Sequence, residues 1–177
     1  MPSPQTLDED ERRTVAAWAA DCAERVLPLF EAEVPDDDRP RDGIRRARAF
    51  ARGELDAAGE IRRRFTAGRA SAVVASPAAK AAAWAAGQAS GVAHMGAHAL
   101  GAAAYAAKAA AAADPAGGAT DELTWQMAHM SAPVRAALRR LPPLGTDPSG
   151  PLGSGLLASG ALGAHIRAVQ AALLDDR

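Results

Sequence analysis

The chain has 177 residues, a formal net charge of −1 and a sequence pI of about 6.4. This length is enough for one domain with a substantial core, while the near-neutral charge supplies no overall attraction to DNA or to an anionic membrane. The one cysteine, Cys22, excludes an internal disulfide and a multi-cysteine metal site. Aromatic residues make up only 4% of the chain and alanine takes their place, which favours closely packed helices over sheets.

The opening residues, MPSPQTLDEDERR, are acidic and polar, unlike a secretory signal or a transit peptide. We therefore expect a cytoplasmic protein with a flexible stretch at residues 1–7. A first helix is predicted to begin near Leu7, with a buried apolar stripe that contains Cys22. Arg25 lies inside this stripe by angle, and Asp21 precedes it by one helical turn. The spacing predicts an Asp21–Arg25 ion pair, which is either structural or part of a ligand site.

Opposite charges are concentrated in two successive stretches. Residues 8–38 hold eleven acidic residues and three arginines, whereas residues 39–69 hold ten arginines and four acidic residues. Two interpretations stay open: the stretches pair with each other within the fold, or they present a surface to an anion or an acidic partner. The loop between them supplies the partner-surface candidates Asp36, Asp37, Asp38, Arg39 and Arg41.

Helices are predicted at residues 39–50 and 55–75, followed by one long central helix at residues 81–113. Ser76, followed by proline, fits the start of the central helix, and Asp114, also followed by proline, fits its end. The central run is long enough to cross a bilayer but poor in large aliphatic side chains, so we favour a helix surrounded by other helices. On a continuous helix, small and polar residues share one stripe, namely Gly87, Gly91, His94, His98, Gly101 and Tyr105.

The C-terminal part is predicted to contain a helix at residues 120–138 with a kink at Pro133, a Pro/Gly-rich loop at residues 142–153 and a last helix at residues 154–174. Beside the core face of the first of these helices lies a polar stripe, which forms either a groove or a water-facing surface and consists of Glu122, Gln126 and His129. The prediction is an all-α, single-domain bundle of about six helices around the central Ala/Gly-rich helix, spanning residues 1–177.

Several segments resemble the Imm-5-like family of immunity proteins, which is common in actinobacteria and sometimes labelled exonuclease-like. They are WAADCAERVLPLFE at residues 18–31, PDDDRPR at residues 35–41, AHMGAHALGAAAYAAK at residues 93–108, and Glu122 with Trp125-Gln126. The resemblance covers roughly residues 11–138, whereas the tail from residue 141 departs from the usual ending of the family. It implies a helical, non-enzymatic protein that binds and neutralises a toxin or a toxic small molecule.

The histidines of the central run leave three roles open. His94 and His98 have the i, i+4 spacing that can hold a metal ion on a helix, but further ligands would have to come from elsewhere. The first role is structural, with both rings packed and hydrogen-bonded. The second is a small-molecule or acid/base site, and the third is a weak metal site. No catalytic residue, resident metal or cofactor is predicted, and the ligand-binding candidates are Asp21, Arg25, His94, His98, Tyr105, Glu122, Gln126 and His129.

We therefore expect a binding protein of immunity or resistance type, whose partner is a toxin protein or a toxic small molecule. The alternative is a helical enzyme of specialised metabolism, with a pocket that brings Asp21 and Arg25 together with His94, His98 and Tyr105. A cavity of several hundred cubic ångströms at the histidines would favour an enzyme or small-molecule binder. A membrane partner is not expected, and nucleic acid is a weaker candidate because the basic stretch lacks an aromatic platform. The small-residue stripe is also compatible with a homo-oligomer.

Overall fold

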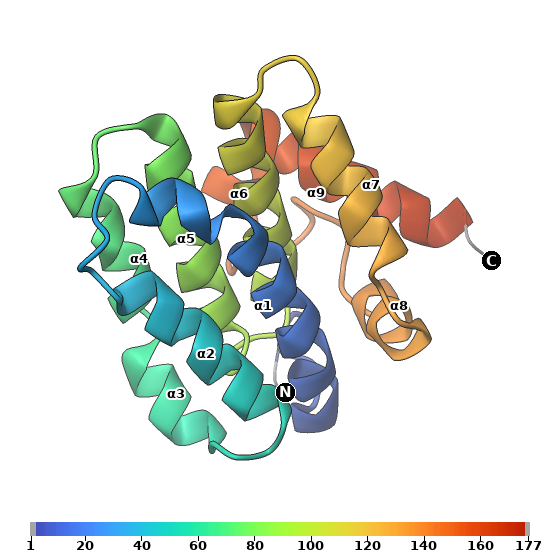
Figure 1. Cartoon of the computed structure of the whole chain (residues 1–177). Coiled ribbons are helices and arrows are strands. Elements are labelled where there is room, and N and C mark those ends of the chain that lie inside the picture. The colour runs from blue at the N-terminus through green and yellow to red at the C-terminus, as the bar shows by residue number, and fades with distance from the viewer. Residues whose placement is uncertain (1–2, 176–177) are drawn as a thin grey trace.

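The computed structural model describes residues 3–175, which are all-α and contain no β-strand. In chain order they form α1 (Glu9–Glu31), α2 (Arg39–Ala51), α3 (Ala57–Arg63), α4 (Thr66–Arg69), the 3-10 turn η1 (Ala70–Val73), α5 (Pro77–Gly91), α6 (His98–Ala113), α7 (Gly118–Ala128), α8 (Ala132–Arg139), the 3-10 turn η2 (Leu156–Ala158) and α9 (Gly160–Asp175) (Figure 1). The all-α prediction is confirmed. The predicted number of about six helices is too low, because three of the expected helices are divided.

The long central helix predicted at residues 81–113 is wrong, because the chain reverses direction between α5 and α6. In the reversal, the backbone N–H groups of Gly96 and Ala97 donate to the carbonyls of Thr6 (2.9 Å) and Gln5 (3.0 Å) instead of to the preceding helical turn. Alanine exceeds other residues in helix propensity by less than about 1 kcal/mol per residue. Packing of α5 and α6 against each other and against α1 overrides that preference.

The two ends of the alanine-rich run lie where the sequence predicts them. Ser76 caps α5, since its hydroxyl accepts a hydrogen bond from the Ala79 N–H (3.1 Å), and Pro77 occupies the first helical position. At the other end, α6 stops at Ala113 and Asp114 takes an extended conformation. Local capping signals were therefore reliable even where the helix between them was not continuous.

Two further predicted helices also divide. Residues 55–75 form α3, α4 and η1, and residues 120–138 form α7 and α8. In the second case Ser131 is the N-cap of α8, with its hydroxyl accepting from the Val134 N–H (3.4 Å). Pro133 lies in the first turn of α8, where its missing N–H breaks no helical hydrogen bond, so it begins a helix rather than kinking one.

Helix α1 begins at Glu9, slightly later than predicted, because Asp8 and Glu11 form a capping box. The Asp8 carboxylate accepts from the Glu11 N–H (2.9 Å), and the Glu11 carboxylate accepts from the Asp8 N–H (3.1 Å). The last helix, α9, begins at Gly160 rather than at residue 154, since η2 precedes it.

The N-terminal segment lies against the loop that follows α8. Of residues 1–7, expected to be flexible, the first two lie outside the described residues, whereas Gln5 is only 1% exposed. Its amide nitrogen donates to Asp147 Oδ2 (2.6 Å) and to the Ser149 carbonyl (2.8 Å), and its amide oxygen accepts from the Leu152 N–H (2.9 Å). Gln5 thus links the Pro/Gly-rich loop, which its side chain contacts, to the α5–α6 reversal, where its backbone carbonyl accepts from the Ala97 N–H.

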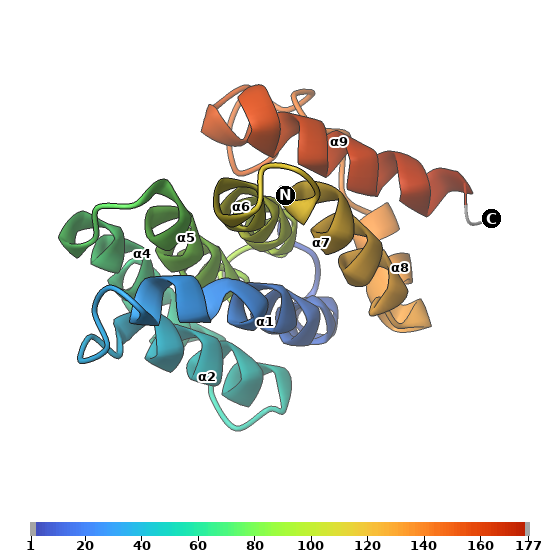
Figure 2. The ribbon, with the colours of Figure 1, turned by 45° about the horizontal axis from the view of Figure 1, so that its top comes forward.

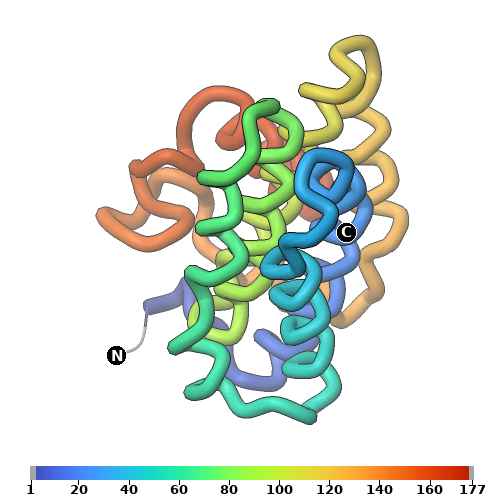
Figure 3. The backbone as a smooth tube through the Cα atoms, turned by 60° about the vertical axis from the view of Figure 1, so that its left-hand side comes forward, coloured from blue at the N-terminus to red at the C-terminus, as the bar shows by residue number. Residues whose placement is uncertain are grey.

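Helices α5 and α6 lie in the middle of the bundle. Helix α1 packs on both, α2 packs on α1 and α5, and α9 covers α6 on the opposite side (Figure 2). Figure 3 shows α5 and α6 side by side, with α1 and α2 on one flank and the orange loop that precedes α9 on the other. Much of the core between these helices is alanine, which permits short distances between helix axes. Within residues 3–175, no helix has the length and apolar character needed to cross a lipid bilayer.

Candidate functional site

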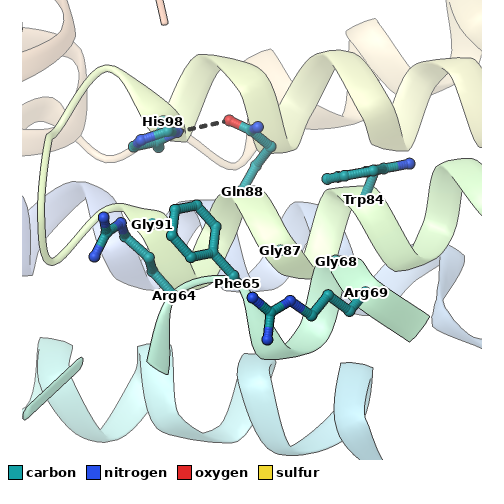
Figure 4. A pocket seen from close by; sticks show the side chains of 9 residues that line it. All are labelled: Arg64, Phe65, Gly68, Arg69, Trp84, Gly87, Gln88, Gly91 and His98. Carbon is teal, nitrogen blue, oxygen red and sulfur yellow. Dashed lines mark hydrogen bonds between the residues drawn. The ribbon is translucent and has the colours of Figure 1, made fainter. Parts of the chain in front are cut away.

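Two adjoining hollows lie along the outer face of α5. The larger, of about 430 Å³, is lined by Arg64, Phe65, Gly68, Arg69, Trp84, Gly87, Gln88, Gly91 and His98 (Figure 4). The smaller, of about 290 Å³, is lined by Trp84, Gln88, Tyr105, Gly150, Pro151, Gly155, Leu156 and Leu157. Because Trp84 and Gln88 belong to both, we refer to the two hollows together as the Trp84 groove.

The floor of the groove depends on a close approach between α4 and α5. A Cβ on Gly87 would lie 2.9 Å from the Cα of Gly68, and a Cβ on Gly68 would lie 3.0 Å from the Trp84 ring. Both distances are shorter than ordinary contacts, so glycine is required for this crossing. The crossing places the Trp84 indole over the backbone of α4.

Three large apolar side chains of the groove are exposed to solvent. Phe65 is 56% exposed, Trp84 43% and Leu156 69%, and they come from the start of α4, from α5 and from η2. Trp84 also stacks on Tyr105 of α6, with ring centroids 6.1 Å apart and planes inclined by 25°. The groove therefore presents a partly ordered apolar surface to water.

Two arginines border the same surface. The Arg64 guanidinium lies 4.3 Å from the centroid of the Phe65 ring and donates to the Ile61 carbonyl (2.6 Å). Arg69 is exposed and lines the larger hollow from α4. Neither forms an ion pair with a carboxylate within the described residues, and no acidic side chain lines either hollow. Figure 4 shows Arg64 and Arg69 on either side of Phe65, His98 and Gln88 above it, and Trp84 farther to the right.

His98 supplies the polar group at the inner end of the larger hollow. Its Nδ1 lies 2.8 Å from Gln88 Oε1, an acceptor, so the neutral ring donates through Nδ1 and keeps its lone pair on Nε2. Burial lowers the pKa of His98 to about 4, with smaller contributions from His94 and Arg64, so the ring is neutral near pH 7. Burial, with Arg64 and Arg12 nearby, also lowers the pKa of His94.

The two histidines do not form the predicted i, i+4 pair on one helix. His94 lies in the reversal before α6, and its ring centroid is 6.4 Å from that of His98. Across residues 3–175, no group of three or more histidine, cysteine or acidic side chains is placed to hold a metal ion.

A second polar cluster lies between α1, α7 and α9, away from the groove lining, with Glu122, Gln126 and His165 buried and Arg25 exposed at its edge. Glu122 is 3% exposed and accepts from Arg25 Nε (2.9 and 3.1 Å) and from Gln126 Nε2 (3.3 Å). The Arg25 guanidinium also lies 4.1 Å from the centroid of a Trp125 ring, and Gln126 Oε1 lies 2.8 Å from His165 Nε2. Most polar atoms of these side chains have a hydrogen-bond partner within the cluster, which is typical of a structural network.

The predicted Asp21–Arg25 pair is wrong. Asp21 instead accepts from Arg48 of α2 (2.6 Å), because Asp21 faces α2 while Arg25 faces α7 and its buried carboxylate. The Arg48 guanidinium also lowers the pKa of Glu24 through a hydrogen bond. The acidic and basic stretches thus pair with each other, including Arg41 with Glu31 (2.7 Å), and Arg39 pairs with Asp37 (2.5 Å) inside the loop.

The eight ligand-binding candidates are consequently dispersed. His98 and Tyr105 line the Trp84 groove, and the exposed Arg25 bonds to the buried Glu122, which in turn accepts from the buried Gln126. Asp21 lies between α1 and α2, His94 lies in the α5–α6 reversal, and His129 is exposed and stacks on Trp125 with centroids 4.0 Å apart. A further hollow of about 520 Å³ between α8 and α9 contains none of the eight.

The comparison with protein families found a match that covers most of the chain. The sequence profile described as "Imm-5 like putative immunity protein" matches residues 5–133. The chain belongs to the Imm-5-like family. No curated protein and no solved structure matches it. The Imm-5-like match includes α1 to α7 and the start of α8, and it leaves out η2 and α9.

The Trp84 groove was missed at the level of sequence, although one signal for it exists. Trp84, Gly87, Gln88 and Gly91 follow i, i+3, i+4, i+7 spacing and so share one face of α5. This face combines the one large side chain of its helix with two glycines and an amide. Most of the groove lies within the Imm-5-like match, whereas Leu156 and its neighbours lie outside it.

Proposed function

We propose that this chain is an immunity protein that neutralises a toxin by binding it at the Trp84 groove. The observation that supports this most directly is the exposure of Phe65, Trp84 and Leu156 beside two arginines, Arg64 and Arg69, that have no carboxylate partner within residues 3–175. Contiguous exposed apolar surface commonly marks an interaction site, and tryptophan and arginine are enriched at the centres of protein interfaces. Membership of the Imm-5-like family supports a toxin as the partner.

The charged loop at residues 36–41 is the other candidate surface for the toxin. Its arginines are already engaged, Arg39 with Asp37 and Arg41 with Glu31. A partner would have to replace these internal ion pairs, so the net gain from each contact would be small. We therefore assign the main role to the groove.

A second candidate function is binding of a toxic small molecule. The larger hollow, of about 430 Å³, has the size of a small-molecule site, and Gln88 with His98 supplies a few fixed polar atoms within an apolar lining. Covalent catalysis would require further groups besides Gln88 and His98. His98 is hydrogen-bonded to an amide, and a nucleophile–base pair would be needed beside it.

The proposal is tested by growth competition between a strain that carries the gene and a strain from which it has been deleted. We expect the deletion strain to be inhibited by its parent, and a plasmid copy of the gene to restore growth. A copy with Phe65→Ala and Trp84→Ala should fail to protect while accumulating to the normal amount. A copy with Leu174→Ala, which removes an exposed apolar side chain of α9 outside the groove, should protect fully.

Equal growth of the deletion strain and its parent, alone and in mixture, would contradict toxin immunity. The two candidate functions separate by the nature of the inhibitor. If the low-molecular-mass filtrate of the parent culture inhibits the deletion strain, a small molecule is the partner. If only the macromolecular fraction inhibits, the partner is a protein.

A further inference from the structure

We infer that the occupant of the Trp84 groove is an acidic protein segment with a bulky apolar side chain beside its carboxylates. This inference rests on the proposed function and adds the chemistry of the partner. It follows from three features of the groove, namely its exposed apolar side chains, its unpaired arginines and its open shape.

The apolar part of the partner is indicated by the rings of the groove. Trp84 is held in place by stacking on Tyr105 and by the backbone of Gly68 beneath it, so it offers a fixed surface although nearly half of it is exposed. Phe65 and Leu156 stand at either end with more than half of their surface in water. Bulky apolar side chains along the segment, such as leucine, phenylalanine or tryptophan, would remove these three from water at little cost in ordering the groove.

The acidic part of the partner is indicated by the charge of the lining. Arg64 and Arg69 contribute two positive charges, and Arg62 and Arg63 are exposed on the adjoining α3. None of the four forms an ion pair within residues 3–175, whereas Arg46 and Arg48 of α2 are both paired. Since no carboxylate lines the groove, the arginines would repel a basic segment. The carboxylates of an acidic segment could form ion pairs with these guanidinium groups.

The shape of the groove favours a protein segment over a small ligand. Both hollows are partly open to solvent, and because Trp84 lines both, they continue past it from α4 to η2. A typical small-molecule site encloses most of its ligand, whereas an open groove with aromatic anchors suits a polypeptide that lies along it. The far end, formed by Gly150, Pro151 and Leu156, would contact a different residue of the segment from the arginine end.

The inference is tested with three synthetic peptides of about 15 residues, a length that spans such a groove. The first carries glutamates interspersed with leucine and tryptophan, the second has lysine in place of every glutamate, and the third has alanine in place of every leucine and tryptophan. Binding to the full chain is followed by NMR through the indole N–H of Trp84, whose signal is identified by its loss in Trp84→Phe. We expect the first peptide to bind at least about tenfold more tightly than either of the others, since it alone satisfies both chemistries.

Two variants separate the charged from the apolar contribution. Arg64→Gln with Arg69→Gln should weaken the first peptide about tenfold at low salt and remove most of its salt dependence. The matched control is Arg45→Gln, which removes an exposed arginine of α2 outside the groove and should leave the affinity unchanged. Phe65→Ala should weaken the first peptide by a similar factor without any change in salt dependence.

The inference would be overturned by equal or tighter binding of the lysine peptide, by unchanged affinity in the double arginine variant, or by no binding of the first peptide up to about 1 mM, which corresponds to a binding free energy weaker than about −4 kcal/mol. Tighter binding of 2-naphthoate than of any peptide would also overturn it, in favour of a small aromatic acid. If the peptides fail but the Phe65 and Trp84 substitutions still abolish protection in growth competition, the groove binds the toxin through other chemistry. The proposed function would then stand without this inference.

Discussion

Replacing His165 by glutamine should remove a defined part of the pH dependence of stability. His165 is 9% exposed, and its Nε2 lies 2.8 Å from Gln126 Oε1. Gln126 Nε2 donates to the Ala103 carbonyl (3.0 Å) and to Glu122, which assigns Gln126 Oε1 as an acceptor. His165 therefore donates through Nε2 as a neutral ring, and burial lowers its pKa to about 4.

The sign and size of the effect follow from the difference between the folded and unfolded states. A histidine in an unfolded chain titrates near pH 6.5. Its contribution is fully present above that pH and is lost as the pH falls toward the folded pKa of about 4, because only the unfolded state takes up a proton in this interval. With about 1.4 kcal/mol per pKa unit, the free energy of unfolding should be about 2 kcal/mol lower at pH 5 than at pH 8 from this group alone.

The measurement is urea unfolding of the wild type and of His165→Gln at several pH values between 5 and 8. Glutamine keeps a donor toward Gln126 but does not titrate, so the variant should lose about 2 kcal/mol less than the wild type on acidification. Burial also lowers the pKa of His98 to about 4, so its contribution to the pH dependence is the same in both proteins and cancels in the comparison. Parallel pH curves for the two proteins, or an NMR titration of His165 near pH 6.5, would refute this assignment.

Three further substitutions should each lower the free energy of unfolding, because each removes or strains a specific contact. Arg25→Met leaves the buried Glu122 carboxylate without its cation and should cost about 2 to 3 kcal/mol, most of it recovered when Glu122→Leu is added. Gln5→Ala removes three hydrogen bonds, and should cost about 2 kcal/mol and speed amide exchange in the loop at residues 147–152. Gly87→Ala forces a Cβ against the Gly68 backbone and should cost about 1 to 2 kcal/mol by urea unfolding, despite alanine's better helix propensity.

Each of these substitutions has an outcome that contradicts its reason. If Arg25→Met and the double variant are equally unstable, the loss comes from packing on Trp125 and not from an unpaired carboxylate. If amide exchange in the loop is unchanged in Gln5→Ala, the loop is held by other contacts. A stabilised Gly87→Ala would mean that α4 moves away from α5 without penalty, in which case the Trp84 groove should also change its affinity for the acidic peptide.

Local signals predicted much of the fold, and non-local contacts account for what they missed. The caps at Ser76 and Asp114 depend on neighbouring residues alone and were predictable. The reversal before α6 depends on hydrogen bonds from Gly96 to Thr6, ninety residues away, and no periodicity rule contains that information. The division at Pro133 was readable in principle, because a serine two residues before a proline fits a new N-cap as well as it fits a kink.

The candidate site was harder to predict than the fold because its parts meet only after the bundle has formed. Trp84 in a run of alanines is typical of a core residue, yet it is 43% exposed and lies over the Gly68 backbone of α4, a position that depends on the crossing of two helices. Leu156 lines the same surface because the preceding loop is held by a hydrogen bond from the Leu152 N–H to the Gln5 side chain. At the level of sequence the arginines of α3 and α4 belong to the same charge set as those of α2, yet the ion pairs of residues 39–69 involve its arginines only as far as Arg52. This difference within one basic stretch is visible only when the partner of each arginine is known, and it leaves Arg64 and Arg69, which line the Trp84 groove, without a carboxylate partner in residues 3–175.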